Sequence, residues 1–269
     1  DYSHDDIPEA WRLIGEDPRD DVRAPQFAQL VRAFMPDVLD LQEYSLHMHQ
    51  QFYPLIRRYG YRIAYEGEEP WNNTPIFYNP ETVELVDVNY VLYAPSCWSN
   101  IGSKSYTSAV FRKKDTGRLF AVVNTHLWWK SEAAQPGSTY ARAAQVRLMM
   151  AEAEVLKNKY GCTIFVTGDM NAYEDSLPIR QFIEGGYTPC YKAATDATDN
   201  GNGHHICGPK DGYSRTSRRR SPDREKGAID HCFIYNAQEG VAVKVFDCIT
   251  ARITVKLTDH YPYLIDAAL

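Results

Sequence analysis

The sequence predicts an α/β protein organised as a four-layer sandwich, in which two packed mixed β-sheets are flanked by helices. Three observations lead to this prediction: predicted strands outnumber predicted helices, hairpins are frequent, and several strands are apolar throughout. Uniformly apolar strands indicate burial on both faces, as in sheets that helices cover. The chain has 269 residues, of which 44% are hydrophobic, and this suffices for one large domain. We therefore expect a single domain over residues 1–269 rather than an alternating βα barrel.

The first third of the chain predicts two helices and three strands. Phe27, Leu30, Val31 and Phe34 recur at the spacing of one helix face. A second helix is indicated around residues 52–59, although Pro54 weakens the pattern there. Short runs rich in apolar residues predict strands at 38–41, 75–79 and 82–93.

The rest of the chain alternates between strands and one long helix. The polar residues 113–117 separate two apolar runs, which predicts a hairpin of strands at 107–112 and 119–125. A long helix begins at Ser138 or Thr139, and its predicted core face is formed by Ala144, Leu148, Ala151 and Val155. Further strands are predicted at 162–167, 228–235, 241–249 and 263–267, and residues 195–227 are predicted to form a long surface loop.

Composition limits the partners of this protein. The formal net charge is −6, so the whole molecule does not attract polyanions, and affinity for nucleic acid requires a local basic patch or a bound cation. The chain has no apolar run of about 18 residues, which excludes a predicted membrane span. We expect a soluble protein that is either cytoplasmic or secreted with its signal peptide removed, and the sequence does not decide between these compartments.

Polar side chains gather at the ends of the predicted strands. Acidic, amide or imidazole groups end or follow four apolar strands and directly precede a fifth. They are Glu43, Asn124 with His126, Asp169 with Asn171, Asp230, and Asp259 with His260. Each has an ordinary explanation when taken alone, such as a capping carboxylate or a turn residue. Groups at strand ends can converge at one rim of a sheet, and the five clusters together predict an active site there.

These residue types are suited to the hydrolysis of a phosphate ester. The hard oxygen ligands of Glu43 and Asp259 suit Mg²⁺, which also binds substrate phosphate. The imidazole of His260 can act as a general base near neutral pH when a carboxylate aligns it. Asn171 and His126 can donate hydrogen bonds to the charge that develops on a reacting phosphate. We therefore expect a phosphate-ester substrate, with nucleic acid as one candidate.

The ordered set resembles the endonuclease/exonuclease/phosphatase superfamily, the deoxyribonuclease I-like fold. Its members include deoxyribonuclease I, abasic-site endonucleases, neutral sphingomyelinases, inositol polyphosphate 5-phosphatases and deadenylases. The similar motifs are Leu41-Gln42-Glu43, Asn124-Thr125-His126-Leu127, Gly168-Asp169-Met170-Asn171, Ile229-Asp230-His231 and Thr258-Asp259-His260. Any one motif is a weak signal, but five in order over residues 41–260 are specific.

The resemblance implies a role for each motif. Glu43 is expected to hold Mg²⁺, for which Mn²⁺ can substitute, with Asp259 as a second or water-mediated ligand. Asp169 and Asn171 are expected to position the attacking water and the phosphate, while His126 stabilises the transition state. Asp230 then orients His260 as the base, although some accounts of the family give Asp169 that role.

One feature departs from the family pattern. Members begin with a strand that carries a metal-site Asn, about 25 to 40 residues before the Leu-Gln-Glu motif, whereas the first asparagine of this chain is Asn72. We expect that the domain lacks its first strand here because the chain begins after it. If the Asn is absent from the protein, a binding module that has lost catalysis becomes the competing interpretation.

The substrate is less well determined by the sequence. A nuclease or general phosphodiesterase is slightly favoured, and the alternatives are a phosphatase or phospholipase C-type enzyme acting on inositol phosphates or sphingomyelin. A glycosidase would explain Glu43 and Asp169 but leaves the His–Asp pairs unused. Asn73, Trp128 and Trp129 are the candidate substrate-binding residues, because they lie beside the motifs and offer an amide and stacking rings.

Overall fold

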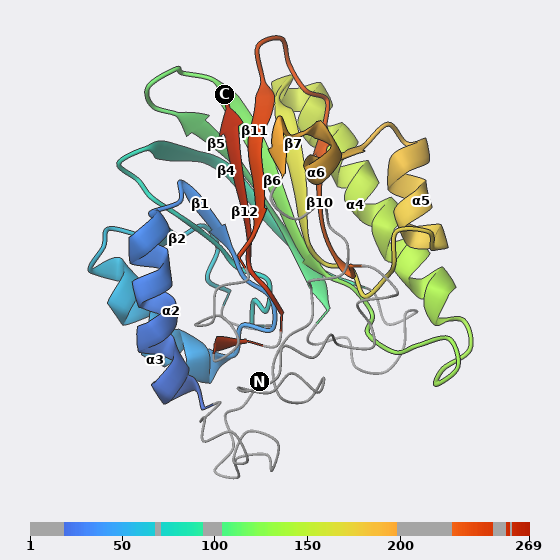
Figure 1. Ribbon diagram of the computed structural model, residues 1–269, viewed down its shortest axis with the longest axis horizontal. Helices are drawn as coiled ribbons and strands as arrows, with labels where there is room; N and C mark the ends of the chain where they lie inside the picture. The colour runs from blue at the N-terminus through green and yellow to red at the C-terminus, as the bar shows by residue number, and fades with distance from the viewer. Residues whose placement is uncertain (1–18, 68–70, 94–103, 198–227, 250–256, 259) are drawn as a thin grey trace.

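The strands lie between two pairs of helices, as Figure 1 shows. The computed structural model describes residues 19–67, 71–93, 104–197, 228–249, 257–258 and 260–269. On one side lie α2 (Asp20–Phe34) and α3 (Leu46–Arg57), and on the other lie α4 (Ser138–Tyr160) and α5 (Leu177–Glu184). The predicted four-layer α/β sandwich is therefore confirmed.

A six-stranded sheet forms one of the two inner layers. Its strand order is β4-β5-β6-β7-β10-β8. The bounds are β4 (Val83–Leu92), β5 (Ser105–Lys113), β6 (Leu119–His126), β7 (Thr163–Asp169), β10 (Asp230–Tyr235) and β8 (Thr188–Pro189). Neighbouring strands are antiparallel except β6 and β7, which are parallel and are joined through α4. The sheet is therefore mixed, and β6 and β7 end at the same edge.

The opposing layer consists of two three-stranded sheets. The first has the order β1-β3-β2, and the second has the order β12-β11-β9. The bounds are β1 (Val38–Asp40), β2 (Arg62–Ile63), β3 (Ile76–Tyr78), β9 (Asp196–Ala197), β11 (Ala242–Cys248) and β12 (Tyr263–Ala268). Among the described residues the predicted second sheet is thus divided in two. The last short helix is α6 (Cys190–Ala193).

Three apolar clusters hold the layers together. Val146, Met149 and Ala153 of α4 pack on Val123 and Val166 of the six-stranded sheet. A second cluster fills the space between the sheets, and its largest members are Phe111, Phe120, Phe165 and Phe246. The third joins α2 and α3 to β3 through Ala28, Phe52 and Phe77. Both faces of the six-stranded sheet and the outer face of β3 therefore have a buried partner, which explains the uniformly apolar sequences of strands such as β6 and β7.

The core face of α4 differs from the predicted one. Leu148 and Val155 were expected inside, but they are 45% and 57% exposed, whereas Val146 and Met149 are fully buried. Apolar residues occur around the whole helix, so the pattern offers two competing faces, and the contact with β6 and β7 selects between them. In α2 the end of the predicted face is also exposed, since Phe34 is 42% exposed.

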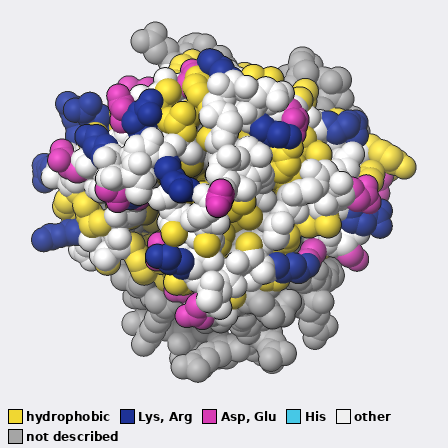
Figure 2. Space-filling view, turned by 90° about the horizontal axis from the view of Figure 1, so that it is seen from above, with side chains coloured by type: hydrophobic (Ala, Val, Ile, Leu, Met, Phe, Trp, Pro, Cys, Tyr) yellow, Lys and Arg dark blue, Asp and Glu magenta, His cyan; other side chains and the backbone are white. Residues whose placement is uncertain are grey.

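One end of the sandwich carries side chains of both charges. The end opposite the termini of β6 and β7 carries interspersed basic and acidic side chains, without one large region of either sign (Figure 2). No helix in the described part of the chain is both long and apolar enough to cross a membrane. The predicted loop 195–227 begins with β9, and its residues 198–227 lie outside the described part, as do residues 1–18.

Asn124 connects the two inner layers beside the end of β6. Its Nδ2 donates to the carbonyl oxygens of Leu41 at 2.7 Å and Pro75 at 3.1 Å. Its Oδ1 accepts a hydrogen bond of 2.7 Å from Nε2 of Gln42. The side chain is fully buried. These three bonds attach the segment after β1 to the six-stranded sheet, where water cannot replace them.

Replacing Asn124→Val should destabilise the protein by about 2–4 kcal/mol, because the change removes three hydrogen bonds of a fully buried amide. Urea unfolding followed by tryptophan fluorescence measures this loss. Asn89→Val is the matched control, since its exposed amide bonds only Glu152 at 3.3 Å, and it should change stability by less than about 0.5 kcal/mol. Equal midpoints for the two variants would contradict the proposed connection.

Candidate active site

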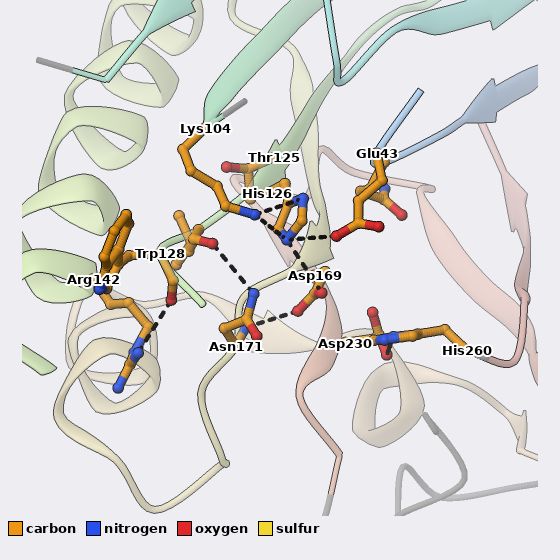
Figure 3. Close-up of polar contacts among 12 residues, drawn as sticks. Glu43, Lys104, Thr125, His126, Trp128, Arg142, Asp169, Asn171, Asp230 and His260 are labelled. Carbon is orange, nitrogen blue, oxygen red and sulfur yellow. Dashed lines mark hydrogen bonds and ion pairs between the residues drawn. The ribbon is translucent and has the colours of Figure 1, made fainter. Parts of the chain in front are cut away.

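Three of the expected site residues lie side by side across neighbouring strands. His126 at the end of β6 pairs with Asp169 of β7, which in turn pairs with Asp230 of β10. Directly paired residues present their side chains on the same face of a sheet. His126 Nε2 lies 3.4 Å from Asp169 Oδ2, and Figure 3 shows the row from the front. The strand register alone therefore brings these side chains together.

Gly168 allows β6 and β7 to approach closely at this row. Its φ of +138° is unfavourable for other residues, and an added Cβ would lie 2.0 Å from the carbonyl oxygen of Thr125. Steric contact with Thr125 therefore explains why the first position of the Gly-Asp-x-Asn motif is a glycine. A side chain here would separate Asp169 from the end of β6.

The turn after β7 fixes Asn171 beside the same edge. Its backbone N–H donates to Asp169 Oδ1 at 2.8 Å, and its Nδ2 donates to the carbonyl oxygen of Leu127 at 3.2 Å. Asn171 has a φ of +46°, a conformation that asparagine tolerates better than most residues. The bond from Leu127 N to the Asp169 carbonyl at 2.9 Å closes the arrangement. Asn171 is therefore held by both strands.

Glu43 reaches the row from the opposing layer. It follows β1 in a left-handed conformation, with φ +53°, next to Gln42, which Asn124 anchors. Its Oε1 lies 4.0 Å from His126 Nε2, and its side chain is 63% exposed. Glu43 is thus the carboxylate of this group most accessible to a solvated cation.

Asp230 and His260 form a close pair next to the row. His260 Nδ1 lies 2.8 Å from Asp230 Oδ2, and their side chains are 30% and 12% exposed. The backbone before His260 is anchored by Arg23, whose Nη1 donates to the Leu257 carbonyl at 2.6 Å. Arg23 is itself held by Asp20 at 2.7 Å. Helix α2 therefore positions the segment that carries His260.

His126 is a neutral imidazole in this environment. Burial, followed by the charge of Lys104, lowers the pKa of His126 to about 4, although Asp169 and Glu43 oppose the change. Burial raises the pKa of Glu43, while the charge of His126, which is protonated only at the acidic pH where Glu43 titrates, and the charge of Lys104 lower it, and the balance holds that pKa below its usual range. At neutral pH the site thus combines an ionised Glu43 with an uncharged His126, which can serve as a hydrogen-bond partner rather than as a cation.

Lys104 belongs to the site, and the sequence reasoning missed it. Its Nζ lies 2.6 Å from His126 Nε2 and 3.1 Å from Nδ1, and the residue is only 4% exposed. Burial lowers the pKa of Lys104 to about 8, against the charges of Asp169 and Glu43. No motif marks this position, because Lys104 precedes β5 and meets His126 only through the pairing of Tyr106 with Thr125. A lone lysine before a strand carries no signal in one sequence.

The donor set fits a divalent cation. Asp169, Asp230 and His260 each offer a ligand atom, and these atoms lie within 4.8 Å of one another. His260 Nδ1 already bonds Asp230, so a cation that used that nitrogen would have to break the bond. Glu43 presents an exposed carboxylate nearby. Asp259, the second expected ligand, lies outside the described residues.

The expected substrate-binding residues lie in different environments. Trp128 is 2% exposed, and its Nε1 donates to Ser138 Oγ at 3.2 Å, so its ring packs on α4 rather than facing solvent. Trp129 is 55% exposed, with Lys130 Nζ 5.6 Å from its ring centre. Asn73 donates to the Trp71 carbonyl at 3.2 Å. Of the two tryptophans, Trp129 thus offers a free ring face.

Several solved structures have an architecture similar to that of this chain. A mannosyl-6-phosphatase from Bacteroides thetaiotaomicron is 18% identical with a TM-score of 0.73, and the match covers 98% of this chain and 96% of that chain. The human Nocturnin catalytic domain with a bound sulfate anion is 18% identical, with a TM-score of 0.67 and coverage of 97% and 91%. D. rerio TDP2 in complex with a single-strand DNA product is 16% identical, with a TM-score of 0.66 and coverage of 96% and 95%. At these identities the likeness shows a common fold.

The family assignment follows from the sequence profile. No curated protein sequence matches this chain. The profile of the Endonuclease/Exonuclease/phosphatase family matches residues 14–260, which include all five motifs. With this match and the deoxyribonuclease I-like architecture, the chain belongs to the Endonuclease/Exonuclease/phosphatase family.

Proposed function

We propose that this protein is a Mg²⁺-dependent phosphoesterase in which His260 and Asp230 activate water against a phosphate ester. The observation that carries the proposal is the 2.8 Å Asp230–His260 pair beside the His126–Asp169 row at one sheet edge. Members of the family are phosphoesterase hydrolases. A catalytically inactive binding module would have no need of a carboxylate-aligned imidazole at this place.

His260 serves as the base in this proposal. Asp230 accepts a hydrogen bond from His260 Nδ1, which fixes the tautomer and places the lone pair that would take a proton from water on Nε2. Its 30% exposure gives the ring access to solvent. Asp169, which is held by the Asn171 backbone, is the second candidate for this role. The hydroxide so formed attacks phosphorus, and the bond to the leaving oxygen breaks.

His126 and Asn171 stabilise the reacting phosphate. A neutral His126 can donate from one ring nitrogen to a phosphate oxygen, and burial keeps water from competing. The Asn171 amide already lies at the same edge through its bond to Leu127. These donors are held by backbone and strand register, so little reorganisation is needed when charge develops.

Glu43 is the proposed Mg²⁺ ligand, with Asp259 as the second. Bound Mg²⁺ would supply charge neutralisation for the phosphate and the leaving oxygen. Oxygen ligands of this kind suit Mg²⁺, and Mn²⁺ can substitute. The exposed carboxylate of Glu43 suits an ion that keeps several waters.

The substrate is a phosphate ester, and we favour a phosphodiester, including nucleic acid. The TDP2 structure with a DNA product shows that this fold accommodates such a ligand. A phosphatase is the second candidate, because the mannosyl-6-phosphatase has the same fold. The exposed ring of Trp129 is available to stack on the leaving group of either substrate.

Glu43→Gln should weaken Mg²⁺ binding at least about tenfold, because the change removes the anionic ligand and keeps the shape. Calorimetry of Mg²⁺ binding measures the effect, with Glu81→Gln, an exposed glutamate, as the matched control. If Asp230→Asn weakens Mg²⁺ binding about tenfold and Glu43→Gln leaves it unchanged, the cation lies among Asp169, Asp230 and His260 instead.

Asp230 and His260 should behave as one unit. His260→Ala should lower kcat by about 10²–10⁴-fold with the fold and Mg²⁺ affinity retained, and Asp230→Asn should lose much of the same rate. The double variant should be little worse than the worse single one, as expected for residues that serve one step. Steady-state kinetics test this, with Asp266→Asn as an exposed control. If the two single losses in kcat multiply in the double variant, the residues act independently, and Asp169 becomes the candidate base.

A further inference from the structure

Lys104 is a buried cation at the centre of the site, and no residue that the structure describes forms an ion pair with it. It is 4% exposed. Within the described part of the chain its ammonium bonds only His126, and no carboxylate oxygen lies within 4.0 Å of it. Burying an ammonium group is costly unless a charged partner compensates it. A position of this kind indicates that the compensating anion comes from a ligand.

The geometry of the contact identifies where that ligand lies. An ammonium group only donates hydrogen bonds, so its 2.6 Å contact with His126 Nε2 requires a lone pair on that nitrogen. An anion beside the two groups would accept one hydrogen bond from Lys104 and a second from Nε2 of His126, in the tautomer that carries the proton on that nitrogen. Asp169 and Glu43 approach the same nitrogen from the opposite side, at 3.4 Å and 4.0 Å.

We propose that Lys104 is a substrate-contacting residue that, together with His126, holds one non-bridging oxygen of the phosphate group. The inference rests on the proposed function. Ammonium groups bind phosphate oxygens as compact point charges. Mono- and diesters both carry non-bridging oxygens, so Lys104 contributes to binding the phosphate rather than to choosing between these classes.

The backbone around Lys104 is built to hold this position. Its carbonyl accepts a hydrogen bond from Tyr93 N at 3.0 Å, and the following Ser105 accepts one from Thr125 Oγ1 at 3.0 Å. Thr125 also bonds Tyr93 Oη at 2.6 Å. The ends of β4, β5 and β6 are thus tied together directly behind Lys104. The backbone from which the Lys104 side chain reaches His126 is therefore held in a fixed position.

The test compares Lys104→Gln with Lys104→Arg and with Lys114→Gln, an exposed lysine at the far end of the same strand pair. Calorimetry measures the affinity for inorganic phosphate, first without metal and then with Mg²⁺. Lys104→Gln should weaken phosphate binding by about tenfold or more, Lys104→Arg should retain part of it, and Lys114→Gln should leave it unchanged. In Lys104→Gln, kcat/KM should fall by the same factor as the phosphate affinity. The substrate is p-nitrophenyl phosphate or bis(p-nitrophenyl) phosphate, whichever the enzyme accepts.

Thermal unfolding separates this role from a structural one. Removing an uncompensated buried charge should keep or raise the melting temperature of Lys104→Gln, whereas a structural lysine would lower it. Unchanged phosphate affinity in Lys104→Gln would overturn the inference. If Lys104→Gln does not fold, the phosphate affinity of Lys104→Arg decides. Wild-type phosphate affinity and unchanged turnover in Lys104→Arg would then also overturn the inference. Because phosphate binding needs no turnover, a wild-type protein that binds phosphate through Lys104 but hydrolyses no ester would refute the proposed function alone.

Discussion

The pairing register of β6, β7 and β10 is the constraint on which the site depends. It sets His126, Asp169 and Asp230 in one row, on one face of one sheet. A shift of one residue in either pairing would turn part of the row to the other face. The register is held by the buried interiors of these strands and by the close approach that Gly168 permits. The core therefore positions the side chains of His126, Asp169 and Asp230 directly.

The other groups reach this row through contacts between layers. Asn124 attaches the segment before Glu43 to the six-stranded sheet, and Arg23 attaches the segment before His260 to α2. Asp20 joins the two, because it bonds Arg23 at 2.7 Å and Ser45 Oγ at 3.2 Å, two residues after Glu43. Buried polar bonds of this kind specify one arrangement of the layers, since breaking any of them leaves a partner unsatisfied. The fold and the site are therefore stabilised by the same bonds.

Burial gives the clustered charges their properties. His126 becomes neutral because desolvation and Lys104 both disfavour its protonation, while Glu43 stays ionised in spite of its partial burial. A neutral donor beside an anionic metal ligand and an ammonium group is an arrangement suited to a phosphate that gains charge during reaction. None of these states follows from residue type alone, since each depends on its neighbours.

The layers could be predicted and the five motifs recognised from the sequence because both depend on local patterns of residues. Apolar runs marked the buried strands, and polar residues such as Asp169 marked their ends. The prediction failed where the outcome depends on tertiary contact: the rotation of α4, which leaves Leu148 exposed, and the burial of Trp128. Lys104 was missed although the hairpin of β5 and β6 was predicted, because the predicted strand began at residue 107 and left Lys104 outside it, whereas β5 begins at Ser105.

The central claim is that water attacks phosphorus at this site. Hydrolysis of p-nitrophenyl phosphate or its bis-ester in water labelled with heavy oxygen, with Mg²⁺ present, tests it through the phosphorus NMR shift of the product. The account predicts that one labelled oxygen enters the phosphate group at each turnover, and that chelation of Mg²⁺ abolishes the incorporation. Label found in the released alcohol, or incorporation that persists without Mg²⁺, would contradict it.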